Sequence, residues 1–178
     1  MKRKIEPFKH SSEIFNSLKS GILITTKFDN KVNSMTISWG TLGIEWNKKI
    51  FTIFIRENRF TKFQLDNNPE FTVNIPYGDF DKNILKFCGI KSGYNTDKIK
   101  ELGLTLEDSN TISVPAIKEL PLTLECKVIY RQEQDKGSIS KEDKIAFYPE
   151  DIESSYHGSN RDYHTAYYGE ILDAYIIE

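Results

Sequence analysis

Strict alternation is the sequence feature that most restricts the fold of this chain. Between residues 32 and 39, apolar and hydroxyl-bearing side chains follow one another in turn. A period of two places the two kinds on opposite faces of a strand and argues against a helix, whose period is 3.6. The hydroxyl face would meet either solvent, as is the norm in antiparallel sheets, or the polar edge of a ligand. The apolar residues are Met35, Ile37 and Trp39, and the hydroxyl residues are Ser34, Thr36 and Ser38.

Short β-rich segments of this kind recur along the whole chain. They are bounded by turn residues such as Asp29-Asn30-Lys31, which predicts a hairpin between two neighbouring strands. The first ten residues are interpreted as an arm or an edge strand. Further strands are expected at residues 21–28, 50–55, 70–75, 122–130 and 145–148, and from His164 towards the end of the chain.

Helical spacing is limited to a few short segments. Gly21 ends the first of them, and Pro69 ends the second. Because strands dominate, the chain is predicted to be mainly β with flanking helices, as a closed antiparallel barrel. The helices are expected at residues 11–20, 56–68, 79–87 and 97–103.

Three segments are expected to lack regular structure. Residues 40–47 are interpreted as a connection because they carry Gly40, Gly43 and Asn47. The highly polar segment 131–144 is interpreted as an exposed hairpin tip or a mobile loop. Residues 149–162 form a polar loop that carries His157.

Composition excludes several classes of function. The 178 residues suit one domain, with a net charge of −2 that leaves no basic surface for nucleic acid. Two cysteines do not make a disulfide framework, and no cluster has metal-ligand spacing. The apolar runs are too short to span a membrane and no signal peptide is apparent, so a soluble, cytoplasmic protein is expected.

A candidate anion site follows the apolar run at residues 50–55. That run ends at Arg56, and Arg59, Thr61 and Lys62 come directly after it, at the start of a predicted helix. Free N–H groups at a helix start and the fork of a guanidinium both suit a phosphate. Alternatively, both arginines are surface partners in ion pairs.

Two motifs in this region resemble a known family. Residues 33–40, N-S-M-T-I-S-W-G, and residues 56–61, R-E-N-R-F-T, are similar to N-x-M-T-x-S-W-G and R-P-x-R-Y-T. These are motifs of the flavin reductase-like, FMN-binding split-barrel family, in its flavoredoxin-like branch. The resemblance extends over about residues 15–176.

Two later segments add to the resemblance. Residues 88–98 are similar to C-G-x-x-S-G-R-D-x-D-K, with Tyr94 and Asn95 in place of Arg-Asp. Residues 164–171 are similar to the family's H-x-x-x-x-G-E-V, preceded by Tyr163 where many relatives have Asp.

The resemblance implies a split-barrel Greek key, a homodimer and bound FMN. It assigns the phosphate to Arg56, Arg59, Thr61 and Lys98, and the polar edge of the flavin ring to Asn33, Thr36 and Ser38. Trp39, Tyr168 and a catalytic His164 would shape the pocket over the ring. Further cofactor contacts are expected from Met35, Phe60 and Ser92. The local pattern alone would make Lys98 a solvated helix lysine. It would make His164 a histidine at the start of a strand.

Three functions stay open from the sequence. The first is an NAD(P)H-dependent flavin reductase that takes electrons from NADH or NADPH. The second is an FMN-binding electron carrier reduced by a protein partner, without a nicotinamide site. The third, a β-barrel that has lost flavin, is disfavoured because the motif residues are present. Cys88 is either a redox or nucleophilic thiol or, as we expect, a small buried apolar residue.

Overall fold

The computed structural model describes residues 1–150 and 162–178, and its main body is one antiparallel sheet. The hydrogen-bonded path runs β3-β2-β6-β9-β10-β5-β4, and β1 pairs with β10. A mainly β fold is therefore confirmed. The strands are β1 (Lys2–Lys4), β2 (Ile22–Phe28), β3 (Lys31–Ile37), β4 (Gly40–Glu45), β5 (Lys48–Arg56), β6 (Glu70–Ile75), β9 (Leu122–Glu133) and β10 (His164–Ile177), with a separate pair of β7 (Leu106–Glu107) and β8 (Ala116–Ile117).

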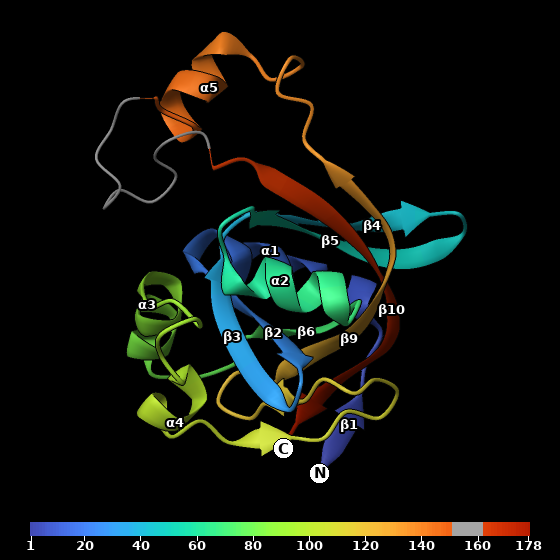
Figure 1. Cartoon of the computed structure of the whole chain (residues 1–178). Coiled ribbons are helices and arrows are strands. Elements are labelled where there is room, and N and C mark those ends of the chain that lie inside the picture. Colours follow the sequence, from blue (N-terminus) through green and yellow to red (C-terminus); the bar gives the residue numbers. More distant parts are fainter. Residues whose placement is uncertain (151–161) are drawn as a thin grey trace.

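Short helices flank this sheet. In Figure 1, α3 and α4 lie to one side of β3, and α2 crosses in front of the sheet. Helix α5 lies at the far end of β9 and β10, away from the sheet. The helices are η1 (Pro7–His10), α1 (Ser11–Ser20), α2 (Phe60–Asn67), α3 (Lys82–Ile90), α4 (Lys98–Leu102) and α5 (Lys141–Phe147). Within residues 1–150 and 162–178, no helix is long and apolar enough to cross a membrane.

The core follows the alternation of the strands. Met35 and Ile37 of β3 belong to the main cluster, together with Phe51 and Ile53 of β5. The apolar face predicted for β3 is therefore confirmed at these two positions. Trp39 departs from the prediction, because β3 ends at Ile37 and the indole is 39% exposed.

Residues 40–47 are not a simple connection, so that expectation was wrong. Residues 40–45 form strand β4, which pairs with β5 through a tight turn. Trp46 and Asn47 hold positive φ angles of 49° and 58°, and consecutive residues of this kind suit the hairpin turn that matches strand twist. The glycines do not mark a loop here, because Gly43 pairs with Ile50 within the β4–β5 pair of strands.

Residues 145–148 are not a strand either. They lie at the end of helix α5 and directly after it. The helix begins inside the polar segment, where the Ser140 hydroxyl accepts from the Asp143 N–H at 3.0 Å and caps the first turn. No residue of α5 is buried, so the helix has no apolar face for a pattern to reveal.

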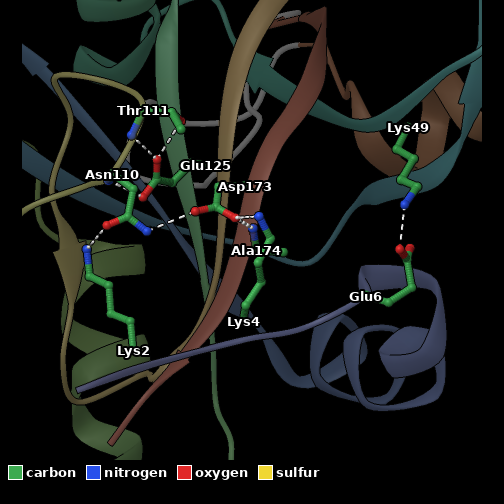
Figure 2. Close-up of polar contacts among 9 residues, drawn as sticks. All are labelled: Lys2, Lys4, Glu6, Lys49, Asn110, Thr111, Glu125, Asp173 and Ala174. Carbon is green, nitrogen blue, oxygen red and sulfur yellow. Dashed lines mark hydrogen bonds and ion pairs between the residues drawn. The ribbon is translucent and has the colours of Figure 1, made fainter.

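A buried carboxylate fixes the outer face of the sheet. Glu125 of β9 is fully buried, and its oxygens accept from the N–H groups of Asn110 and Thr111, each at 2.7 Å. Figure 2 shows how the Asn110 side chain continues this network to Asp173 and Lys2. These contacts tie the loop before β8 to β1, β9 and β10. The hydrogen bonds to Glu125 compensate for the burial of its charge.

Candidate functional site

Three neighbouring hollows follow strand β3. Residues near its start line a small hollow with Arg59 and Lys98, and residues at its end line a cleft with Trp39 and His164. A third, wider hollow opens towards α1 and α3. Met35 and Arg59 border the first two, and Thr36 and Ser38 border the last two, so the hollows adjoin one another.

The first hollow, here called the anion pocket, gathers cations around polar groups. The Lys98 side chain is only 3% exposed and donates to the Cys88 carbonyl at 3.3 Å. No carboxylate is among the described residues that line this pocket. The lining residues are Asn33, Met35, Arg59, Phe60, Thr61, Lys91, Ser92, Gly93 and Lys98. An anion is the ligand that such a set of donors would best accommodate.

Burial weakens the positive charges of the pocket while no anion is present. Desolvation lowers the pKa of Lys98 to about 8, and the nearby Arg59 adds a smaller repulsion. Burial also lowers the pKa of Arg59, although a guanidinium still stays charged at neutral pH. A phosphate in the pocket would reverse this effect, because an opposite charge favours the protonated lysine.

Hydrogen bonding and close packing set the geometry of the pocket. The Asn33 amide donates to the Thr61 hydroxyl at 3.1 Å, which joins β3 to the first turn of α2. Gly93 approaches this pair so closely that a Cβ there would lie 2.4 Å from Asn33 Oδ1 and 2.5 Å from Phe60 Cδ1. Only glycine therefore fits between the two side chains.

The second hollow, here called the aromatic cleft, has a volume of about 160 Å³. The rings of Trp39 and His164 lie 5.0 Å apart, and Phe147 packs edge-on against Trp39 at 5.1 Å. The cleft is lined by Met35, Thr36, Ile37, Ser38, Trp39, Phe54, Arg56, Arg59 and His164. It can accommodate the edge of a planar ring beside aromatic and polar groups.

His164 is a neutral base in this setting. Burial, followed by the charges of Arg56 and Arg59, lowers the pKa of His164 to about 3. Its Nδ1 atom lies 2.8 Å from the Tyr148 hydroxyl, and its ring lies on the wall of the cleft. The imidazole can therefore offer a neutral donor or acceptor to a ligand, but carries no charge near pH 7.

The Arg56 guanidinium is held by backbone carbonyls. It donates to Asp162 O at 2.7 Å and to Phe147 O at 3.1 Å, and it lies 5.2 Å from the Tyr148 ring centre. These contacts tie the end of α5 and the residues before β10 to the end of β5. Arg56 still borders the aromatic cleft, whereas Arg59 borders both the cleft and the anion pocket.

The hydroxyl face of β3 is used in two ways. The Thr36 hydroxyl donates to the Leu85 carbonyl at 2.6 Å, and the Ser34 hydroxyl lies 2.8 Å from that of Thr25. Both therefore join elements of the fold. Ser38 is exposed where the cleft meets the wider hollow, so its hydroxyl is available to a ligand.

Tyr168 is the one predicted site residue that the structure does not bring to these hollows. It pairs with Thr52 and Tyr130 in the sheet, and its ring lies 5.2 Å from that of Tyr130. Among the described residues, it lines none of the three hollows. The other predicted residues line the pocket or the cleft, including Ser92 and Phe60.

Some site residues were missed from the sequence. Lys91 and Gly93 stand directly beside Ser92 in the chain, so their place in the same loop could have indicated them. Phe54 lay within the apolar run and gave no signal of its own. Phe147 and Tyr148 reach the cleft only through α5, which no pattern predicted.

Cys88 is a buried thiol beneath the anion pocket. It is fully buried and unpaired, and burial raises its pKa to about 11. A thiol in this state is a poor nucleophile near neutral pH. Its environment agrees with the expectation of a small buried apolar residue.

Sequence comparison gives both a family and a relative. The family model for the flavin reductase like domain matches residues 16–178. An uncharacterized protein of Archaeoglobus fulgidus is 32% identical over 99 residues, which cover 56% of this chain and 55% of the relative. The chain thus matches about half the length of that curated relative.

Solved structures share the fold. Flavoredoxin of Desulfovibrio vulgaris aligns with a TM-score of 0.65 and 23% identity, over 89% of this chain and 69% of the flavoredoxin chain. An FMN-binding domain of a flavin reductases-like enzyme from Shewanella baltica aligns with a TM-score of 0.67 and 13% identity, over 99% of this chain and 77% of that chain. The split-barrel expectation is confirmed, and this chain belongs to the flavin reductase-like family.

Proposed function

We propose that this protein is an FMN-binding oxidoreductase. One observation carries the proposal: the anion pocket, with the buried Lys98 and with Arg59, adjoins the aromatic cleft along β3, because Met35 and Arg59 line both. A ligand that fits both must have an anionic end and a planar aromatic end. FMN has this form, and structures that share the fold are described as FMN-binding.

The dimensions of β3 suit such a ligand. Asn33 in the pocket and Ser38 at the cleft are five residues apart, which in a strand is about 17 Å. The pocket itself has a volume of only about 10 Å³, so lining side chains such as the exposed Lys91 would have to move for a phosphate to enter. The donors present therefore fit FMN, with the phosphate at Lys98 and the ring at Trp39.

Each group of side chains then has its own task. Arg59, Thr61, Ser92 and Lys98 would hold the phosphate, with Asn33 orienting the Thr61 hydroxyl. Ser38 and neighbouring N–H groups would bind the polar edge of the ring. FMN, when bound, supplies the redox chemistry, so the protein needs no acid–base triad of its own.

Trp39 and His164 would form the wall over the ring. The neutral His164 can hydrogen-bond a ligand in the cleft without adding charge, and Trp39 would limit the access of water. As a consequence, we assign His164 a role in positioning the reacting molecule beside the ring. The proposed reaction is hydride transfer from NADH or NADPH to the flavin.

An electron carrier reduced by a protein partner is the second candidate. Phe147 packs against Trp39 on the wall of the cleft, and an aromatic cover over the flavin ring would favour a carrier that has no nicotinamide site. A flavoredoxin is among the structures that share the fold.

Anaerobic reduction separates the two candidates. The FMN-loaded protein is mixed with NADH or NADPH without oxygen, and the visible flavin absorbance is followed. In a reductase, the flavin absorbance should be lost with a rate constant on the order of 1–10³ s⁻¹, the usual range of enzyme turnover numbers. Absorbance that persists with both nucleotides, but is lost with dithionite, contradicts the reductase and supports the carrier.

We further propose that the protein acts as a homodimer. Trp46 is 61% exposed and packs 6.2 Å from the Tyr130 ring, which in turn contacts Tyr168. An exposed aromatic cluster on the β4–β5 turn, β9 and β10 is suited to a second copy of the chain. Light scattering of the wild-type protein and of Trp46→Glu tests this, because only the variant should be monomeric.

A further inference from the structure

One wide hollow is not required by the flavin site. It lies between helices α1 and α3 and has a volume of about 750 Å³, and we call it the α1–α3 groove. Its lining comes from α1, the end of β3, the segment after β6, and α3. The lining residues are Asn16, Ser17, Ser20, Gly21, Thr36, Ser38, Pro76, Phe80, Lys82, Leu85, Lys86, Gly89 and Ile90.

The chemistry of this groove is that of a site for an aromatic anion. Phe80, Leu85 and Ile90 provide apolar surface. Lys82 and Lys86 lie one turn apart on α3, so their ammonium groups share a face of the helix. Across residues 1–150 and 162–178, no acidic residue lines the groove, and neither lysine has an ion-pair partner.

The groove also opens onto the flavin site. Thr36 and Ser38 line both the groove and the aromatic cleft, so ligands in the two hollows would lie side by side. Gly21 packs closely against this border, because a Cβ there would lie 2.9 Å from the Thr36 methyl group. Its φ of +113° is also a conformation that favours glycine.

We propose that the α1–α3 groove binds a small aromatic anion that exchanges electrons with the flavin. Lys82 and Lys86 would bind its negative group, and Phe80 and Ile90 its ring. This inference rests on the proposed function, because it needs FMN in the neighbouring cleft. For an anionic quinone, the quinone gains two electrons and two protons and becomes the hydroquinone, while the reduced flavin returns to the oxidised form.

Binding of anthraquinone-2-sulfonate tests the proposal directly. Under air, oxidised FMN and this quinone do not react, so calorimetry of the FMN-loaded protein gives an equilibrium Kd. We expect the double variant Lys82→Glu/Lys86→Glu to raise this Kd about tenfold or more, and Ile90→Gln to raise it less. Both lysines and Ile90 are exposed, so the variants should fold.

A matched control removes the effect of net charge. Lys19→Glu/Lys100→Glu changes the charge equally, at exposed lysines that do not line the groove. This control should leave the Kd within about twofold of the wild-type value, because salt screens the long-range effects of exposed charges. In stopped-flow experiments, the rate of reoxidation of the reduced protein should saturate as the quinone concentration rises. The half-saturation concentration should rank the variants in the same order as the Kd.

Several results would overturn the inference. An equal Kd in the groove variant and the control would show that the two lysines do not bind the anion. A loss of FMN affinity in the groove variant would make the groove part of the flavin site, and a change from dimer to monomer would make it a subunit interface. If FMN does not bind but the quinone still depends on Lys82 and Lys86, the proposed function fails while the anion site stands.

Discussion

The Tyr148 hydroxyl lies 2.8 Å from Nδ1 of His164, and both side chains are buried. The same hydroxyl donates its proton to Gln134 Oε1 at 2.8 Å. Its oxygen therefore accepts from His164, which must carry its proton on Nδ1 and leave Nε2 as an acceptor. A residue that follows α5 thus sets the tautomer of the histidine on the wall of the cleft.

Removing this hydroxyl should change the histidine without opening the cleft. In Tyr148→Phe, Nδ1–H of His164 loses its acceptor, so nitrogen NMR should show a shift towards the Nε2–H tautomer. The loss of the hydrogen bonds to His164 and Gln134 should also lower the free energy of unfolding by about 1–3 kcal/mol. Tyr163→Phe is the control, because Tyr163 stacks on the Tyr148 ring and should tolerate the loss of its hydroxyl. An unchanged tautomer in Tyr148→Phe would refute the assignment.

The burial of His164 predicts how stability depends on pH. Its pKa falls from about 6.5 in the unfolded chain to about 3 in the folded protein, so the unfolded state binds the extra proton between these values. Stability should therefore fall as pH drops through this window, by up to about 1.4 kcal/mol per unit from this group. Urea unfolding at several pH values would measure the slope. His164→Gln should have a smaller slope, and equal slopes in both proteins would contradict the burial.

The lowered pKa of Lys98 predicts that FMN binding takes up a proton. Its pKa is about 8 without a ligand, and a phosphate dianion would raise it. Between the two values the complex holds more protons than the free protein, so affinity should fall as pH rises above about 8. Calorimetry at such a pH, in buffers of different ionisation enthalpy, would count the protons. Lys98→Gln should abolish the uptake and weaken binding by about 1.5–3 kcal/mol.

Two glycines provide a matched test of the anion pocket. In Gly93→Ala the new Cβ collides with Asn33 and Phe60, so FMN binding should weaken and stability should fall by about 1–3 kcal/mol. In Gly43→Ala no atom lies within 4 Å of the new Cβ. FMN affinities of the two variants should therefore differ. If both bind FMN as the wild type does, Gly93 does not shape the site.

The alternation of β3 is the clearest case in which sequence predicts structure. Met35 and Ile37 enter the core as expected, because one face of the strand is buried against the rest of the sheet. The pattern could not tell that Ser34 and Thr36 bond to Thr25 and Leu85, since those partners come from other elements. Side chains on a polar face look alike in sequence, whether they meet solvent, protein or ligand.

The far end of the cleft could not be predicted for a related reason. Tyr148 reaches His164 because α5 and the long strands β9 and β10 bring them together. Helix α5 has no buried face, and only its Ser140 cap marks its start. The family motifs predicted that Arg59, Thr61 and Lys98 lie close together. The spacing of Lys98 alone would have suggested a solvated helix residue.

The phosphate clamp is the centre of this account, and comparing FMN with riboflavin tests it most directly. Riboflavin has the same ring and no phosphate, so the ratio of the two dissociation constants isolates the anion pocket. We expect the wild type to prefer FMN by about 100-fold or more, and Arg59→Ala/Thr61→Ala to lose most of this preference, at about 1.5–3 kcal/mol for each charge-assisted contact. Equal affinity of the wild type for the two flavins, or an unchanged ratio in the variant, would contradict the account.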